Sequence, residues 1–133
     1  MSHEQLAQTA IGQYQRLFAS LQPISGHGAL ALPVSVGAYL MNPARAQVRQ
    51  TYADLYRSGH RFTSDQPTTI VAITAINSGE MPSGTVAAVQ TCEVANSPAE
   101  VTYRRAYFKI DPADGALKVF ILNTQLVSSC PVV

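Results

Sequence analysis

The chain has 133 residues, of which 47 % are hydrophobic and only 13 % are charged. A chain of this length usually forms one domain that buries roughly two-thirds of its unfolded surface. We therefore expect a single domain over residues 1–133, and the apolar composition excludes intrinsic disorder. The net charge is +1. Proteins that bind nucleic acid through phosphate neutralisation carry a basic excess, so we expect no nucleic-acid partner.

The N-terminal residues and the cysteines bear on the compartment. Residues 1–5 lack the basic and apolar regions of a signal peptide, and no window approaches the ~18 uninterrupted apolar residues of a membrane span. We therefore expect a cytoplasmic protein without membrane contact. Cys92 and Cys130 form no Cys-x-x-Cys pair, so we expect two reduced side chains. A single bridge between them is the alternative if the chain is secreted.

The N-terminal segment predicts an amphipathic helix over residues 3–21. Ser2 can cap it, and Gln5 can complete a capping box. Pro23 then ends it. Apolar side chains recur at spacings of four and three, which defines one buried face; they are Leu6, Ala10, Tyr14, Leu17, Phe18 and Leu21.

A second helix is predicted from Pro43 to Ser58. Asn42 is a good N-cap residue, and Pro43 is a good first helical residue. Gly59 offers the left-handed exit at the other end. The apolar stripe consists of Ala44, Val48, Tyr52, Leu55 and Tyr56. Between the two helices, residues 22–42 fit a short helix, a short strand or a packed loop.

The remainder of the chain predicts four strands. Their ranges are 68–77, 85–95, 101–110 and 116–126, and short turns rich in Gly, Pro, Asn and Asp join them. Such connections are too short for parallel crossovers, so the strands form an antiparallel meander. The predicted fold class is α+β, with two N-terminal helices packed on one face of a curved four-stranded antiparallel meander.

The sheet carries apolar residues on both faces. If Ile110 lies opposite Ala116, then Tyr103 pairs with Asn123, and Tyr107 pairs with Val119. A sheet with one solvated face alternates cleanly between apolar and polar residues, and this one does not. Two helices cover one face only. We therefore expect a second copy of the chain, or another partner, to cover the other face, which predicts a homodimer through the sheet.

This layout resembles the nuclear transport factor 2-like superfamily of cone-shaped α+β domains, which is related in shape to the cystatin fold. The resemblance rests on the opening helix with Tyr14, Leu17 and Phe18, on the helix Pro43–Ser58, and on the meander from Thr68 to Leu126. It implies dimerisation through the sheet and a pocket between sheet and helices. Because residues 22–42 are too few for the family's further helix and hairpin, a cystatin-like or trimmed relative is the alternative.

The sequence contains no complete catalytic or metal-binding motif. His3, His27 and His60 each fit a terminus or loop better than a general base. Metal-ligand spacings and Gly-rich phosphate loops are absent from the sequence, so we expect no metal and no cofactor. Glu93 and Asp54 are the acidic candidates for a pocket, and we interpret both as solvated carboxylates; Asp65, Asp111 and Asp114 fit turns.

A polar cluster in the meander is the candidate ligand-binding site. It comprises Tyr103, Arg105 and Asn123, with Gln90 and Gln125 nearby. On a concave face these side chains would be the few polar groups of an apolar pocket, where Arg105 suits a carboxylate-bearing ligand. On a convex face they would form a wet dimer interface, where Tyr and Arg are enriched. Of the two, we favour the interface interpretation.

Three hypotheses for function follow from these features. The first is a non-enzymatic homodimeric domain that binds a small molecule or a protein partner in or beside a pocket between helices and sheet. The second is a small cofactor-independent acid/base enzyme of the isomerase, dehydratase or hydrolase type, with Tyr103, Glu93 or Asp54 in the site. The third is an accessory domain that only assembles. A polar cavity with a carboxylate favours the enzyme, and an apolar cavity favours binding.

Overall fold

The computed structural model describes residues 2–59, 68–96 and 99–130. Helix α1 spans His3–Leu21, a short 3-10 helix η1 spans Gln22–Ile24, helix α2 spans Val34–Gly37, and helix α3 spans Ala44–Ser58. The capping box at the start of α1 is confirmed, because the Ser2 hydroxyl accepts from the Gln5 N–H at 3.1 Å and the Gln5 side chain accepts from the Ser2 N–H at 2.8 Å.

The boundaries of α3 differ slightly from the prediction. The helix begins at Ala44, one residue later than expected, with Pro43 as its cap residue. Asn42 still supplies the capping oxygen, which accepts a hydrogen bond from the Ala46 N–H at 3.1 Å. Gly59 ends the helix at φ 70°, in the left-handed conformation that the sequence predicted.

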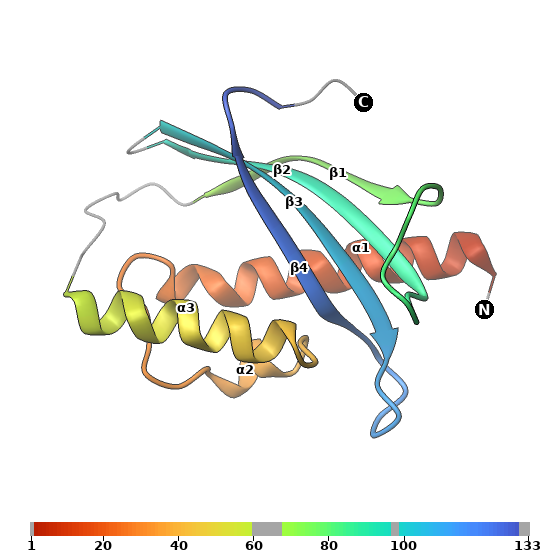
Figure 1. Ribbon diagram of the computed structural model, residues 1–133, viewed down its shortest axis with the longest axis horizontal. Coiled ribbons are helices and arrows are strands. Elements are labelled where there is room, and N and C mark those ends of the chain that lie inside the picture. The colour runs from red at the N-terminus through yellow and green to blue at the C-terminus, as the bar shows by residue number, and fades with distance from the viewer. Residues whose placement is uncertain (1, 60–67, 97–98, 131–133) are drawn as a thin grey trace.

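Four strands form one antiparallel sheet in the order β1-β2-β3-β4. Strand β1 spans Thr69–Ile76, β2 spans Ala87–Asn96, β3 spans Ala99–Ile110 and β4 spans Leu117–Val127. The helices lie together on one side of this sheet, as Figure 1 shows. The predicted α+β fold, with N-terminal helices packed on one face of a four-stranded meander, is therefore confirmed.

The register of the last hairpin differs from the one expected. Ile110 pairs with Leu117 rather than Ala116, and an irregularity between Tyr107 and Phe108 adds a second one-residue shift. The first shift moves Val119 opposite Phe108, on the helix-covered face. The two shifts together amount to two residues, which restores the original facing because side chains alternate with period two. Arg105 consequently pairs with Asn123, and Tyr103 with Gln125.

The main core lies between the helices and one face of the sheet. Tyr14 and Leu17 of α1 and Val48 of α3 contribute to it from the helix side. The sheet contributes alternate residues of β2, β3 and β4, which are Val89, Ala106, Phe108, Leu117 and Val119. Packing of an apolar helix face against a sheet in this way supplies most of the stability of the helices.

Residues 22–42 join the two long helices as a packed loop with short helical turns. Leu40 forms a parallel bridge with Val119, which ties the loop to the edge strand β4. Gly28 has φ 76°, and a Cβ there would lie 2.3 Å from the Tyr52 carbonyl oxygen. Only glycine fits this close approach. The loop therefore fixes the position of α3 against the rest of the fold.

The face of the sheet away from the helices, which we call the open face, is covered in part by the chain itself. Ala88, Tyr107 and Phe120 are buried there, and Met81 from the loop between β1 and β2 packs against them. The Lys109 ammonium lies 4.4 Å from the centre of the Phe120 ring. Part of the apolar surface of this face is therefore covered within one chain, and the expected cover by a second copy or another partner stays a prediction.

The cysteines are joined by a disulfide, contrary to the expected reduced state. Cys92 lies on the open face of β2, and Cys130 follows β4 with a Cα–Cα distance of 5.7 Å. Because the meander is antiparallel, the chain that leaves β4 at Val127 turns back over the sheet and reaches β2. Spacing along the sequence could not reveal this proximity, which depends on the order of the strands.

Candidate functional site

A buried carboxylate lies between α1 and the sheet. Glu93 is only 1 % exposed, which corrects our interpretation of it as a solvated group. Its facing is set by β2, where it alternates in step with Thr91 and Val89 toward the helices. Its Oε2 accepts hydrogen bonds from the Tyr14 hydroxyl and, at 2.7 Å, from the Thr91 hydroxyl. A buried carboxylate requires such partners.

Arg104 of β3 completes this group. Its Nη1 lies 3.0 Å from Glu93 Oε1, and its side chain is 26 % exposed. Burial acts to lower the pKa of the guanidinium, but the Glu93 carboxylate together with Tyr14 and Tyr52 outweighs burial, so the pKa of Arg104 is raised. The Nε of Arg104 is buried without a hydrogen-bond partner, and it is the one side-chain atom of this kind in residues 2–59, 68–96 and 99–130.

Two tyrosines from different helices lie near this ion pair. Burial raises the pKa of the Tyr14 phenol, and the neighbouring Glu93 carboxylate raises it further. Burial also raises the pKa of Tyr52 on α3, where Arg104 acts in the opposite direction. Both phenols are therefore neutral at physiological pH. We call Tyr14, Tyr52, Thr91, Glu93 and Arg104 the buried polar group.

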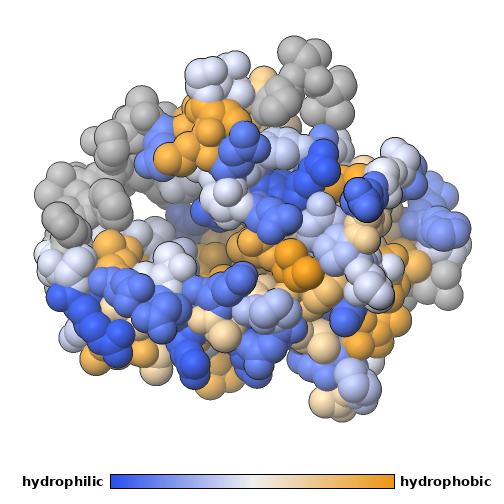
Figure 2. All heavy atoms as spheres, in the orientation of Figure 1, coloured by the Kyte–Doolittle hydropathy of each residue, from blue (hydrophilic) through white to orange (hydrophobic). Residues whose placement is uncertain are grey.

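The helix-covered face of the sheet is open beside the buried polar group. Along β4, Leu117 and Val119 are buried on this face, but Thr124 and Leu126 farther along the strand are exposed, Leu126 at 66 %. Thr124 pairs directly with Arg104. Figure 2 shows the surface hollowed between α3 and the sheet. The partly exposed guanidinium of Arg104 thus lies next to a region where the helices leave the sheet uncovered.

The predicted ligand-binding residues gather on the open face. The Tyr103 hydroxyl donates to Gln90 Oε1 at 2.6 Å, and Arg105 Nε donates to the Tyr103 hydroxyl at 3.2 Å. Asn123 pairs with Arg105 across β3 and β4. Tyr103, Arg105, Asn123 and Gln90, which we call the open-face cluster, therefore lie together, but on the side of the sheet opposite the helices.

The other candidate residues lie apart from the buried polar group. Asp54 is exposed on α3, where it accepts from Gln50 at 2.7 Å, so its interpretation as a solvated carboxylate is confirmed. His27 is exposed in the loop before Gly28. His60 and Asp65 lie outside the described residues. The described segments contain no group of three His, Cys, Asp or Glu side chains that could hold a metal ion.

Sequence reasoning found Glu93 but missed its partners. Tyr14 was predicted only as a member of the apolar stripe, and Arg104 was not among the candidate residues. Two signals were available in the sequence. Alternation along the strand places Glu93 on the opposite face of the sheet from Gln90 and Cys92. The consecutive residues Arg104 and Arg105 must likewise face opposite sides of the sheet. One of the two had to point toward the helices.

No protein-family model, curated protein or solved structure matches this chain. The resemblance to the nuclear transport factor 2-like superfamily accordingly stays a hypothesis based on layout. Within the described residues, none of the helices has the length and apolar character needed to cross a membrane.

Proposed function

We propose that the protein is a non-enzymatic domain that binds a small molecule between α3 and the sheet, with Arg104 as the polar anchor. The observation that carries this proposal is the buried Nε of Arg104, which lacks a hydrogen-bond partner. Buried donors in native proteins are normally satisfied, and an exception calls for a physical explanation. A ligand oxygen in the hollow supplies the missing acceptor. The ligand class is an apolar molecule with a carboxylate or other anionic acceptor group.

The contacts of Glu93 favour binding over catalysis. Its Oε1 pairs with Arg104, and its Oε2 accepts from Tyr14 and Thr91. A general base needs an oxygen directed at the substrate proton, and here both oxygens already have partners. Glu93 is therefore assigned as the group that orients Arg104. The acid/base enzyme remains the alternative, and Tyr52, whose neutral phenol lies near Arg104, would be its proton donor.

The proposal is tested with 8-anilinonaphthalene-1-sulfonate, which combines an apolar ring system with an anionic acceptor. We expect its fluorescence to rise on binding to the native protein. Arg104→Lys keeps the positive charge beside Glu93 but removes the Nε donor, so we expect about tenfold weaker binding. The matched control is Arg105→Lys, which changes the next residue of β3 on the opposite face and should leave the affinity unchanged.

The affinities of the two variants show whether the dye binds beside Arg104 or at the open-face cluster. Equal affinity of the wild type and Arg104→Lys would overturn the proposal. Weaker binding by Arg105→Lys with an unaffected Arg104→Lys would place the ligand on the open-face cluster instead. Circular dichroism of each variant separates loss of binding from loss of folding, and competition by decanoate distinguishes a carboxylate site from one that accepts only the aromatic dye.

The open-face cluster supports a second proposal, that two copies associate through this face. Tyr103 and Arg105 are residue types that interfaces favour, and Val71 is exposed on the neighbouring edge strand. Arg105→Glu should dissociate the dimer in sedimentation experiments. Gln125→Glu, on β4 opposite Tyr103, is a control for added negative charge on this face. A monomeric wild type at micromolar concentration would contradict this association.

The compartment is best inferred from the disulfide. Disulfides persist in oxidising compartments and are rare in the cytosol. The bond between Cys92 and Cys130 therefore favours an oxidising compartment over the cytoplasmic location expected from the N-terminal residues. Finding both thiols free in protein purified without oxidation would restore the cytoplasmic interpretation.

A further inference from the structure

A groove lies between the α2 region and the outward side of α3, and it is separate from the hollow beside Arg104. Its volume is about 620 Å³. One wall consists of Leu32, Pro33, Val34 and Ala38, and the other consists of the α3 residues Arg45, Ala46 and Arg49. This is not the buried side of α3, because the stripe that faces the core contains Ala44 and Val48.

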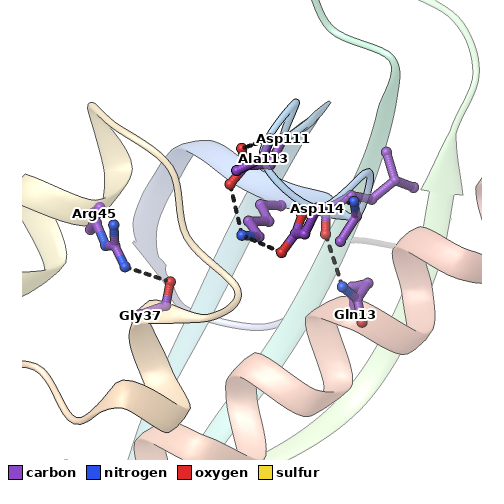
Figure 3. A network of polar contacts seen from close by, with 9 residues as sticks. Gln13, Gly37, Arg45, Asp111, Ala113 and Asp114 are labelled. Atoms are coloured by element: carbon purple, nitrogen blue, oxygen red, sulfur yellow. Dashed lines mark hydrogen bonds and ion pairs between the residues drawn. The ribbon is translucent and has the colours of Figure 1, made fainter.

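Two arginines give the groove a positive charge. Arg45 and Arg49 are separated by one helical turn and lie on the same face of α3. Arg45 Nη2 donates to the Gly37 carbonyl at 3.1 Å, a contact drawn in Figure 3. Because a Cβ at residue 37 would lie 2.9 Å from that same nitrogen, glycine leaves the space in which the guanidinium lies. Arg45 is thus held in place by a neutral group.

The charge of the two arginines is not neutralised by the groove itself. Its lining contains no acidic residue, and Arg49 has no hydrogen bond or ion pair with any described residue. Asp111 is a carboxylate that interacts with Arg45, but it already accepts from Lys118 Nζ at 2.7 Å. Carboxylates are the preferred partners of paired arginines. The groove is therefore complementary to an acidic ligand.

Exposed apolar side chains border the same groove. Val34 is 89 % exposed in its wall, and Leu30 beside the wall is 53 % exposed. Large apolar side chains that remain exposed next to unpaired arginines are typical of a surface that binds another protein. The groove is partly open to solvent, whereas small-molecule sites enclose most of their ligand.

We propose that this groove binds an acidic peptide segment of a partner protein. Two carboxylates of that segment would pair with Arg45 and Arg49, and an apolar side chain between them would lie against Leu32 and Val34. Recognition of acidic motifs by clustered arginines is a recurring mode of peptide binding. The inference is independent of the proposed ligand at Arg104.

The test uses a fluorescein-labelled peptide that alternates glutamate and leucine, with glutamine-leucine and lysine-leucine peptides of the same length. Fluorescence anisotropy with the native full chain should show binding of the glutamate peptide only, weakening as salt is added. Combining Arg45→Gln with Arg49→Gln should weaken binding by at least about tenfold. Arg57→Gln changes an arginine at the far end of the same helix and should have no effect.

A reversal of charge makes the test specific. Arg45→Glu combined with Arg49→Glu should reject the glutamate peptide and bind the lysine peptide. Gly37→Ala, which displaces the Arg45 guanidinium, should lower the affinity for the glutamate peptide without unfolding the protein. Backbone amide NMR of the labelled protein should show the peptide-induced shifts in residues 31–38 and 42–49.

Several outcomes would overturn the proposal. Binding of the glutamate and glutamine peptides with equal affinity would remove its electrostatic basis, and absence of binding to all three peptides would remove the site. Unchanged affinity in the double glutamine variant would do the same. If the double glutamate variant instead converts a sedimenting dimer into a monomer, the occupant is a second copy of this chain and not an acidic segment of another protein.

Discussion

Glu93 on β2 and Arg104 on β3 form an ion pair of 3.0 Å on the helix-covered face of the sheet. The two residues lie on neighbouring strands and are two residues apart in register, because Glu93 pairs with Thr102 and Arg104 pairs with Thr91. Glu93 accepts from Tyr14 and Thr91 as well. The pair therefore links α1 to the centre of the sheet.

Replacing Glu93 tests the contribution of this link. Glu93→Gln removes the charge that compensates Arg104 and weakens the hydrogen bonds from the two hydroxyls. We expect the free energy of unfolding in urea to fall by about 2–3 kcal/mol. Glu100→Gln, at an exposed position of β3, is the control and should change it by less than about 0.5 kcal/mol. Similar stability of the two variants would contradict a structural role for the ion pair.

The raised pKa of Tyr14 predicts a loss of stability in alkali. The usual tyrosine value is 10.0, and burial followed by the Glu93 carboxylate raises the folded-state pKa above it. The stabilisation is complete below pH 10.0, because both states are then protonated, and it is lost as the pH rises toward the folded-state pKa. Urea unfolding between about pH 9 and pH 11 should show a smaller decline for Tyr14→Phe than for the wild type. Tyr56→Phe, at an exposed tyrosine of α3, is the control and should lose stability like the wild type. If it lost as little stability as Tyr14→Phe, the effect would not belong to Tyr14.

The disulfide predicts a specific response to reduction. Cys92 and Cys130 close a loop with a sequence separation of 38. Removing such a cross-link is expected to lower the free energy of unfolding by about 4 kcal/mol, because the unfolded chain gains entropy. Cys130→Ala should show this loss, and reducing agent should destabilise the wild type but not the variant. Thiol titration that detects two free sulfhydryls in the untreated native protein would refute the bond.

Replacing two glycines with alanine should change the stability of the protein in opposite directions. Gly59 has φ 70° at the end of α3, so Gly59→Ala forces a side chain into the left-handed region and should lower stability by about 1 kcal/mol. Gly12 lies inside α1, where a Cβ would meet only an Arg16 nitrogen at 3.5 Å. Gly12→Ala should therefore raise stability by up to about 1 kcal/mol. Thermal unfolding followed by circular dichroism distinguishes the two, and a shared sign would contradict the assigned backbone conformations.

The amino-acid sequence by itself determined the two long helices, the four strands and their order. Local signals were sufficient for this: the capping box of Ser2 and Gln5, the exit at Gly59, and the turn residues between strands. Strand alternation also separated Glu93 from Gln90, since facing along a strand has period two. The open-face cluster came together for the same reason, although the register first assigned to it was displaced by two residues.

Only the tertiary structure decided which segments pack against each face of the helices and strands. The irregularity at Tyr107 and Phe108, the return of the chain that brings Cys130 to Cys92, and the packing of Met81 on the open face depend on contacts between distant segments. Periodicity reports whether a residue is on one side of an element, but not which neighbour covers that side. For this reason Glu93 looked like a solvated carboxylate in the sequence, whereas Tyr14 and Arg104 enclose it in the folded protein.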